Sequence, residues 1–388
     1  MFRELDYYAI DELYSDEERM ARDTVRAFVQ AEVLPDIGKH FSAGVFPAAR
    51  LVPRFGELGL LGSALTGYGC PGMSATAYGL ICQELERGDS GVRSFCSVQS
   101  SLVMFPIWSF GSEAQKERYL PEMARGRIIG CFGLTEPDFG SNPSGMLTTA
   151  VKTAKGYRLT GTKRWITNGS LAHVALVWAK LDGVVRGFLV PTTTPGFSAR
   201  DIHGKWSLRA SVTSELILDD CEVGEDAILP GVEGMKGPLS CLNQARFGIC
   251  FGAVGAMLAC YDEALSYAGT RVQFSRPIAG YQIVQAKLVE MVNEITKAQV
   301  LNWRLGVLKE SGKLRPQQVS LAKRNNVYWA REIARTARDI LGANGVTDEY
   351  QCGRHMLNLE SVYTYEGTHD IHTLVVGQDV TGLPAFDG

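Results

Sequence analysis

The sequence predicts an α+β protein made of a helical segment, a β segment and a second helical segment, and three features of the pattern indicate this class. Apolar residues recur at three- and four-residue spacing in residues 1–125. Short runs rich in β-branched and aromatic residues, with turn residues between them, fill residues 126–235. The helical spacing returns in residues 236–388, without strand–helix–strand alternation. We therefore expect three domains with these bounds.

Individual stretches support each part of this order. The runs YRLTGTKRWITN, HVALVWAKL, VRGFLVP and ELILDDCEV predict strands of the middle domain. The apolar stretch from Phe247 to Cys260 is shorter than the roughly 20 residues of a membrane span, so it predicts a buried helix. Between residues 284 and 308, apolar residues recur every three or four positions, which predicts one apolar face of a long helix that must pack against other helices. These residues are Val284, Leu288, Met291, Ile295, Ala298, Leu301, Leu305 and Leu308.

Composition excludes several classes of protein. The 388-residue chain is 45% hydrophobic and 21% charged, with a net charge of −3 and scattered Lys and Arg, so neither a nucleic acid nor a membrane surface is an expected partner. The nine cysteines are odd in number and lack CxxC spacing, which predicts free thiols in a reducing compartment and no metal site. The acidic, amphipathic N-terminus does not resemble a targeting sequence, so we expect a cytoplasmic location.

Familiar catalytic motifs are missing. No GxGxxG motif follows a predicted strand, and neither a phosphate-binding GxxxxGK[ST] loop nor an HExxH zinc motif occurs. The segment Gly88–Gly91 spells GDSG, as in the nucleophile loop of serine proteases, but it follows a helical ELER segment. We interpret it as a turn.

Four segments together carry a resemblance that covers nearly the whole chain. They are GCFGLTEPDFGSNPS at 130–144, KRWITN at 163–168, RVQFSRPIAGYQIVQ at 271–285 and TYEGTHDIH at 364–372. In this order on a helical–β–helical chain, they resemble the acyl-CoA dehydrogenases. The resemblance implies an N-terminal helical domain, a middle β-barrel or sandwich, and a C-terminal four-helix bundle that carries the catalytic Glu. It also implies bound FAD, a homo-oligomer (a tetramer) and an electron-transfer flavoprotein as partner.

The first segment is a turn cluster whose N–H groups and hydroxyls suit flavin oxygens and a phosphate, although a plain loop has the same composition. The resemblance implies that Trp165 and Thr167 lie against the flavin ring, and that Ser141 also lies near the CoA. Asn142 and Ser275 depart from the family's usual Asp and Gly. No His or Cys stands in an attachment motif of the family, so the FAD is expected to be non-covalent. The expected FAD contacts are Phe132, Leu134, Thr135, Gly140, Ser141, Trp165, Ile166, Thr167, Gly342 and Thr368, with Arg271, Phe274 and Gln282 reaching the FAD of a neighbouring subunit.

Glu366 is the predicted catalytic base. Removing the α-proton of a thioester requires a carboxylate in an apolar site, where desolvation raises its pKa toward neutrality. Tyr363, Tyr365 and Gly367 suit such a site, although a Glu before Gly-Thr-His-Asp is by itself compatible with a solvated loop. The TYEGTHD segment resembles the family's base loop, and we expect Tyr365 and Gly367 to contact the substrate.

A second base position exists in some subfamilies, in a helix just before an Arg. Here that helix reads Leu242-Asn243-Gln244-Ala245-Arg246, and Ala245 cannot accept a proton. Asn243 and Arg246 then remain as expected CoA contacts.

Residues 84–104, ELERGDSGVRSFCSVQSSLVM, resemble the acyl pocket of glutaryl-CoA dehydrogenases. A fatty acyl chain needs an apolar pocket, whereas a dicarboxylic thioester carries an anion that Arg93 can hold through paired hydrogen bonds. Ser94 and Ser97 would add donors, and Glu86 would orient Arg93; a surface ion pair is the alternative. Val92, Phe95 and Cys96 depart from the subfamily's usual residues.

The expected activity is FAD-dependent oxidation and decarboxylation of glutaryl-CoA to crotonyl-CoA and CO2. Three alternatives stay open from sequence. The first is a related enzyme that oxidises another carboxylated or carrier-bound thioester, or that stops at the enoyl product without loss of CO2. The second is a flavin oxidase that uses O2, and the third is a non-catalytic binding protein on the same fold.

Overall fold

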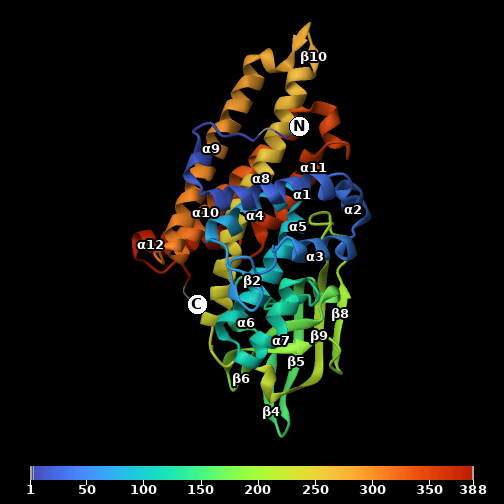
Figure 1. Ribbon diagram of the computed structural model, residues 1–388, viewed down its shortest axis with the longest axis vertical. Coiled ribbons are helices and arrows are strands. Elements are labelled where there is room, and N and C mark those ends of the chain that lie inside the picture. Colours follow the sequence, from blue (N-terminus) through green and yellow to red (C-terminus); the bar gives the residue numbers. More distant parts are fainter. Residues whose placement is uncertain (1, 3, 387–388) are drawn as a thin grey trace.

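The structure is a computed structural model that describes residue 2 and residues 4–386. Three regions follow one another along its longest axis (Figure 1). The β-sheet lies at one end, a layer of N-terminal helices lies in the middle, and two long C-terminal helices project at the other end. This three-domain arrangement of helices, curled mixed sheet and helices confirms the predicted fold class.

The N-terminal region is helical, apart from a two-stranded hairpin of β1 (Thr66–Gly67) and β2 (Cys70–Pro71). Ser15 caps the first long helix through a capping box with Glu18, and Ser74 caps α4 by accepting from Ala77 N–H. Every residue of α4 and α5 is buried, because α4 lies between α1 and α8. These two buried helices carry Glu86 and Arg93. The helices are α1 (Asp16–Phe28), α2 (Ile37–Ala43), α3 (Ala48–Glu57), α4 (Ala75–Gly88), α5 (Ser90–Ser97), α6 (Phe105–Phe110) and α7 (Glu113–Ala124), with π-helical turns at Val29–Val33 and Val98–Met104.

The middle region is one mixed seven-stranded sheet. Its strand order is β3-β6-β4-β5-β9-β8, with β7 paired to β6. Strand β6 pairs parallel with β3 and β4, and the other pairs are antiparallel. A register shift in the β5–β9 pair, between Lys163 and Ile166, turns Trp165 to a φ of 61°. The strands are β3 (Gly130–Gly133), β4 (Thr149–Thr153), β5 (Gly156–Thr167), β6 (Val174–Leu181), β7 (Val184–Pro191), β8 (Phe197–Asp201) and β9 (Thr213–Gly224).

The C-terminal region is a helical bundle. On α9, residues Leu288, Met291, Ile295 and Ala298 of the predicted apolar face are buried. A short hairpin of β10 and β11 joins α8 and α9 at the projecting end (Figure 1). The elements are α8 (Lys236–Thr270), β10 (Val272–Gln273), β11 (Arg276–Pro277), α9 (Gln282–Glu310), α10 (Pro316–Ile340), α11 (Gln351–Thr364) and α12 (His369–Thr381).

Helix α8 is long and apolar enough to span a membrane by length and composition alone. Its apolar 18-residue window is 78% buried inside the protein, however, and the helix packs against α4 and α10. All residues from Phe247 to Cys260 are buried, so this stretch forms the predicted core helix.

Candidate active site

Glu366 lies in the short loop between α11 and α12, in a left-handed conformation. Its φ is 52°, a region that costs a non-glycine residue about 1 kcal/mol or more. Gly367 follows at φ 92°, where an added Cβ would lie 2.8 Å from Nε2 of His372 and 3.2 Å from Nη2 of Arg246. The backbone at Gly367 therefore lies close to its neighbours, and the loop has one narrowly defined conformation.

Two cations hold the main chain of this loop. Arg246 Nε on α8 donates a hydrogen bond to the carbonyl of Glu366 at 2.7 Å. Lys323 Nζ on α10 donates to the carbonyl of Gly367 at 2.7 Å and also to that of Tyr365. The predicted CoA contact Asn243 lies beside them, because its Oδ1 accepts from Nη1 of Arg246 at 3.4 Å.

The carboxyl group of Glu366 is poised to take a proton. The residue is half-buried, and its Oε2 is buried without a hydrogen-bond partner in the part of the chain that the structure describes. Burial raises the pKa of Glu366, while the positive charges of Arg93, Lys323 and Arg246 oppose that rise. Ala245 is fully buried on α8, so the alternative base position offers no carboxylate.

Arg93 lies next to this loop and is completely buried. Its Nε donates to Oε2 of Glu86 at 2.6 Å, its Nη2 donates to the hydroxyl of Tyr365, and its guanidinium carbon lies 5.7 Å from the centre of the Tyr365 ring. Glu86 is also fully buried, so the surface ion-pair interpretation of this pair is wrong. A Cβ on Gly252 of α8 would lie 2.1 Å from Oε2 of Glu86, so only glycine leaves room there.

Three polar atoms around Arg93 have no hydrogen-bond partner among residues 2 and 4–386. They are Nη1 of Arg93, Oε1 of Glu86 and Oγ of Ser97, and all three are buried. Ser94 is 2% exposed on the same helix. Buried polar atoms are normally paired, so this group of residues (the Arg93 cluster: Glu86, Arg93, Ser97 and Tyr365) is complete only with a polar ligand or water.

The three departures from the subfamily lie on α5 beside Arg93 and make no hydrogen bond to the Arg93 cluster among the described residues. Val92, Phe95 and Cys96 are buried in the N-terminal hydrophobic core. Phe95 stacks on Phe46 at 5.0 Å, and Sγ of Cys96 donates to the carbonyl of Leu60 at 3.4 Å. Their differences therefore change the packing behind α5.

The GDSG segment is a structural turn. Asp89 caps α5, with its Oδ1 accepting from Gly91 N–H at 2.7 Å. Its Oδ2 accepts from Arg354 at 2.9 Å and from Asn358 at 2.8 Å, both on α11. The turn thus ties the helix that carries Arg93 to the helix that leads to Glu366.

The predicted flavin loop after β3 is supported by a buried ion pair. Lys163 Nζ donates to Oε1 of Glu136 at 2.8 Å and to the carbonyl of Leu134 at 3.1 Å. Glu136 also accepts from the N–H groups of Leu147 and Thr148, at 2.6 Å and 2.9 Å. Burial lowers the pKa of Lys163 to about 8, and the carboxylate opposes that shift. These bonds fix both ends of the loop.

The residues predicted to line the flavin divide by exposure. Phe132, Leu134 and Ile166 are buried in the hydrophobic cores, which leaves mainly their main chain for a cofactor. Trp165 is 55% exposed, Thr135 and Thr167 are half-buried, and Gly140 and Ser141 are exposed. An open indole face and a turn with exposed Gly and Ser residues fit a flavin ring and a phosphate. Nδ2 of Asn168, which is buried and has no hydrogen-bond partner among the described residues, adds a donor. Thr368 instead caps α12, accepting from Ile371 N–H at 3.1 Å.

Three of the remaining predicted FAD contacts lie far from this loop in the same chain. Arg271, Phe274 and Gln282 are exposed at the projecting end of α8 and α9, opposite the sheet (Figure 1). Phe274 and Ser275 form the two left-handed positions of the β10–β11 turn, and Ser275 thus stands where a family glycine would favour the backbone. Gly342 follows the C-terminus of α10. One chain by itself does not bring the exposed tip residues Arg271, Phe274 and Gln282 to Trp165.

Sequence reasoning missed Lys323, Lys163 and Glu136. A signal for Lys323 exists, because it lies on the apolar face of α10 defined by Val319, Ala322 and Ala330. A lysine at such a position needs buried partners. No comparable signal connects Glu136 with Lys163, because their pairing depends on the sheet register.

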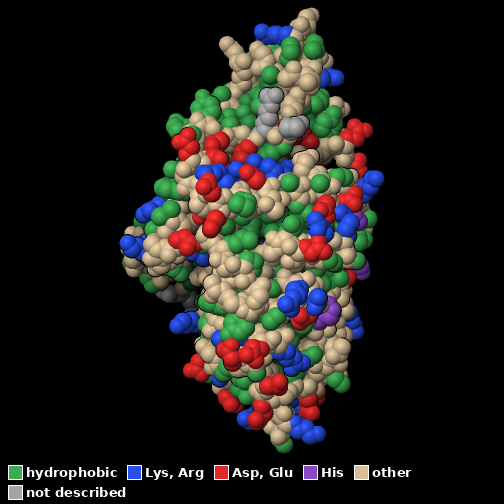
Figure 2. All heavy atoms as spheres, in the orientation of Figure 1, with side chains coloured by type: hydrophobic (Ala, Val, Ile, Leu, Met, Phe, Trp, Pro, Cys, Tyr) green, Lys and Arg blue, Asp and Glu red, His purple; other side chains and the backbone are tan. Residues whose placement is uncertain are grey.

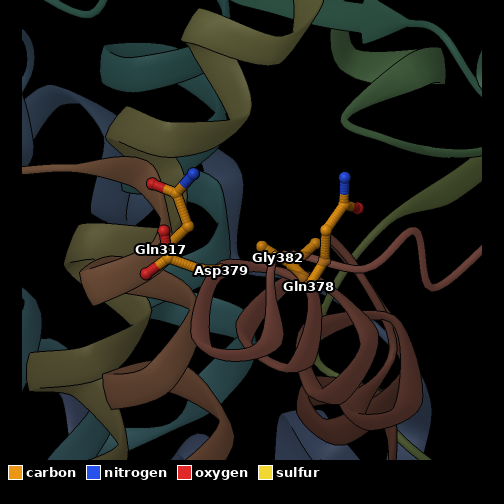
Figure 3. Close-up of a pocket in the computed structure, with 5 residues that line it drawn as sticks. Gln317, Gln378, Asp379 and Gly382 are labelled. Carbon is orange, nitrogen blue, oxygen red and sulfur yellow. The ribbon is translucent and has the colours of Figure 1, made fainter.

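A shallow surface hollow lies elsewhere, between the start of α10 and the end of α12 (Figure 3). Asp379 in it pairs with Arg315 at 2.9 Å. None of the predicted site residues lines it; its lining residues are Gln317, Val375, Gln378, Asp379 and Gly382.

Comparison with known proteins identifies the class that this fold and site define. Sequence models of the N-terminal, middle and C-terminal domains of acyl-CoA dehydrogenase match residues 15–127, 131–221 and 233–381. The chain belongs to the acyl-CoA dehydrogenase family. It is therefore a flavoprotein oxidoreductase that uses FAD and acts on a CH–CH bond.

Two solved structures and one curated relative are similar over nearly the whole chain. Glutaryl-CoA dehydrogenase from Mycobacterium smegmatis is 57% identical with a TM-score of 0.96, covering 97% of this chain and 98% of that one. A glutaryl-CoA dehydrogenase from the same organism, in complex with FADH2, is 51% identical with a TM-score of 0.98 and full coverage of both chains. The human mitochondrial short-chain specific acyl-CoA dehydrogenase is 34% identical over 366 residues, 92% of this chain and 88% of the relative.

Proposed function

We propose that this acyl-CoA dehydrogenase oxidises glutaryl-CoA and removes CO2 from the product to give crotonyl-CoA. The observation that carries the proposal is the buried Nη1 of Arg93, which has no acceptor among the described residues. The terminal carboxylate of a five-carbon dicarboxylic thioester supplies such an acceptor, whereas a fatty acyl chain leaves the buried Nη1 without one at a cost of about 1–3 kcal/mol. The identity of 57% and 51% to glutaryl-CoA dehydrogenases supports the same substrate.

The first step is removal of the α-proton by Glu366. The half-buried carboxylate, its pKa raised by burial, is the base. The flavin supplies the acceptor for the hydride that leaves the β-carbon. The N–H of Glu366 is a candidate donor to the thioester carbonyl, where it would stabilise negative charge as the proton leaves.

The second step is loss of CO2 from the enoyl product. The carboxylate then lies γ to the thioester across the new double bond, so the electrons of the breaking C–C bond flow into the thioester carbonyl. Glu366, now protonated, returns its proton to the γ-carbon and yields crotonyl-CoA. Arg93 selects the carboxylate, and its bonds to Glu86 and Tyr365 moderate how tightly it opposes departure of CO2.

The experiment is turnover of glutaryl-CoA with CO2 and crotonyl-CoA measured together. Equal amounts of both products support the proposal. Oxidation without CO2 would indicate a non-decarboxylating enzyme, and faster turnover of another carboxylated or carrier-bound thioester would change the substrate. Running the same assay with O2 and with an electron-transfer flavoprotein as alternative acceptors distinguishes an oxidase from the proposed dehydrogenase.

The proposal extends to the cofactor's attachment, the assembly and the location. FAD is held non-covalently, so acid denaturation should release all of the flavin from the precipitated protein. The distance between Trp165 and the exposed tip residues supports a homo-oligomer, proposed to be a tetramer, in which the tip of one subunit reaches the flavin of another. All nine cysteines are free thiols, which supports a reducing, cytoplasmic location. On the face in Figure 2, acidic and basic side chains are interspersed, as expected of a protein without a nucleic-acid partner.

A further inference from the structure

The main chain of the base loop is bound by cations at three successive carbonyl groups. Lys323 Nζ donates to the carbonyls of Tyr365 and Gly367, and Arg246 Nε donates to the carbonyl of Glu366 between them. Lys323 comes from α10 and Arg246 from α8, so the loop is held from two helices of the bundle. The two Lys323 bonds bracket the residue that must present its carboxylate to the substrate.

Packing alone does not account for a lysine at this position. Lys323 is 2% exposed, and the residues one turn before and after it on α10 include the buried Val319 and Val327. A buried ammonium is costly unless it is paired, and an apolar side chain of similar length would avoid that cost. The partners that Lys323 has are the two carbonyls of the base loop.

The side chain of Tyr365 extends this arrangement to the Arg93 cluster. Its ring centre lies 5.7 Å from Nζ of Lys323 and 5.7 Å from the guanidinium carbon of Arg93. Its carbonyl accepts from Lys323 and its hydroxyl from Arg93. Lys323 therefore fixes the residue that joins the base to the proposed carboxylate anchor.

Lys323 and Glu366 influence each other's pKa values. Burial lowers the pKa of Lys323 to about 7, and attraction to the Glu366 carboxylate opposes this shift. In turn, the charge of Lys323 opposes the rise in the pKa of Glu366. The titratable or charged groups that face Lys323 are Glu366 and Tyr365 of the loop, Arg246 and Cys250 of α8, Arg93 of α5, and His369 and His372 of α12.

We propose that Lys323 is the positioning residue of the catalytic base, holding the carbonyls on both sides of Glu366 and stabilising its ionised carboxylate. The inference rests on the proposed role of Glu366 as the base. It assigns to Lys323 no contact with substrate or flavin. Its effect passes through the conformation and the charge state of Glu366.

The test is Lys323→Met, which keeps the length of the side chain but removes its charge and its donors. The pH at which kcat/KM for flavin reduction is half-maximal should rise by about one unit, because a nearby positive charge no longer favours the carboxylate. Below that pH, the rate should fall about tenfold, while FAD content and substrate-analogue binding stay at wild-type levels. Lys323→Arg, which keeps the charge, should restore the midpoint toward the wild-type value.

Lys205→Met is the matched control. Lys205 also donates to two loop carbonyls, those of Leu208 at 3.0 Å and Ser211 at 2.8 Å, but in the middle domain. Its removal should leave the pH midpoint unchanged. If Lys323→Met shows the wild-type midpoint, whether or not its rate falls, Lys323 is only structural and the inference is wrong.

Two further variants keep the test decisive. If Lys323→Met does not fold, Lys323→Gln, which is neutral but keeps N–H donors, is measured against the same criterion. Glu366→Gln tests the assignment of the base separately from the role of Lys323. If this variant still reduces flavin, Glu366 is not the base. If it is inactive and the Lys323 variants keep the wild-type midpoint, only the inference about Lys323 fails.

Discussion

Arg93 and Tyr365 are 272 residues apart in the chain, yet Nη2 of Arg93 donates a hydrogen bond to the hydroxyl of Tyr365. Tyr365 directly precedes Glu366, so this contact sets the distance between the proposed carboxylate anchor and the proposed base. The contact exists because α5 of the N-terminal domain packs against α8 and α11 of the C-terminal domain. The predictions below test both ends of this link and the parts that support it.

Glu366→Gln should fold and bind FAD but lose the reductive half-reaction. Gln has nearly the same shape and cannot accept a proton, and a general base contributes at least about 10²–10⁴-fold. Anaerobic stopped-flow mixing with acyl-CoA, monitoring bleaching of the flavin, measures the loss. Bleaching within tenfold of wild type would mean that another group takes the proton.

The reductive half-reaction of the wild-type protein should depend on pH in one direction. Glu366 accepts a proton only when ionised, and burial raises its pKa above the ordinary 4.5. The rate should therefore be highest above the raised pKa and fall as the pH drops through it. A profile of kcat/KM against pH reports this group in the free enzyme. A rate that increases toward acid would contradict a carboxylate base.

Arg93→Gln should weaken glutaryl-CoA turnover far more than turnover of a neutral acyl-CoA of equal length. Truncating a charge-assisted pair in a dry site costs roughly 2–5 kcal/mol, so the ratio of the two kcat/KM values should shift by at least about thirtyfold. The measurement is kcat/KM for both substrates in wild type and variant.

Arg87→Gln is the control for this experiment. Arg87 is also a buried arginine, paired with Glu84 at 2.8 Å on α4, but it does not contact Tyr365 or Glu366 among the interactions described for it. Its substitution should lower stability without a change in substrate preference. If Arg93→Gln likewise affects both substrates equally, Arg93 is structural and the dicarboxylate assignment is wrong.

Lys163→Met should destabilise the protein and lower its FAD content. The change leaves the Glu136 carboxylate buried without its cation, which costs about 3–5 kcal/mol, and it frees the carbonyl of Leu134 at the start of the flavin loop. Urea unfolding and the ratio of flavin to protein absorbance measure the two effects. The control is Lys152→Met on the exposed neighbouring strand β4, which should change neither the stability nor the FAD content. Wild-type stability and FAD content in the Lys163 variant would show that the ion pair does not support the loop.

Phe274→Asp should weaken the oligomer and reduce bound FAD. Phe274 is 91% exposed at the tip of the β10–β11 hairpin, where Figure 2 shows hydrophobic side chains on the projecting end. In the proposed oligomer, a charge there would be buried against a neighbouring subunit. Sedimentation velocity and flavin content give the result, with Val184→Asp at the exposed start of β7 as the control. An unchanged oligomer with full flavin would place Phe274 outside the interface.

Local patterns in the sequence were sufficient for the order of the three domains, the core helix at Phe247–Cys260, and the turn at Gly88–Gly91. The periods of helices and strands are properties of neighbouring residues, so they can be read without the fold. The resemblance of four short segments added the family, and with it the expectation that Glu366 is the base. The pairing of Glu86 with Arg93 was also expected, because the two residues lie seven positions apart in the segment that resembles the acyl pocket.

Only the tertiary structure decided which distant groups surround Glu366. Lys323, Arg246 and Arg93 come from three different helices, and their contacts with residues 365–367 depend on how those helices pack. The burial of Phe132, Leu134 and Ile166, and the pairing of Lys163 with Glu136, likewise follow from the sheet's register and packing. Local sequence specifies the conformation of a segment, whereas the pKa of a carboxyl group depends on charges and burial contributed by the whole fold.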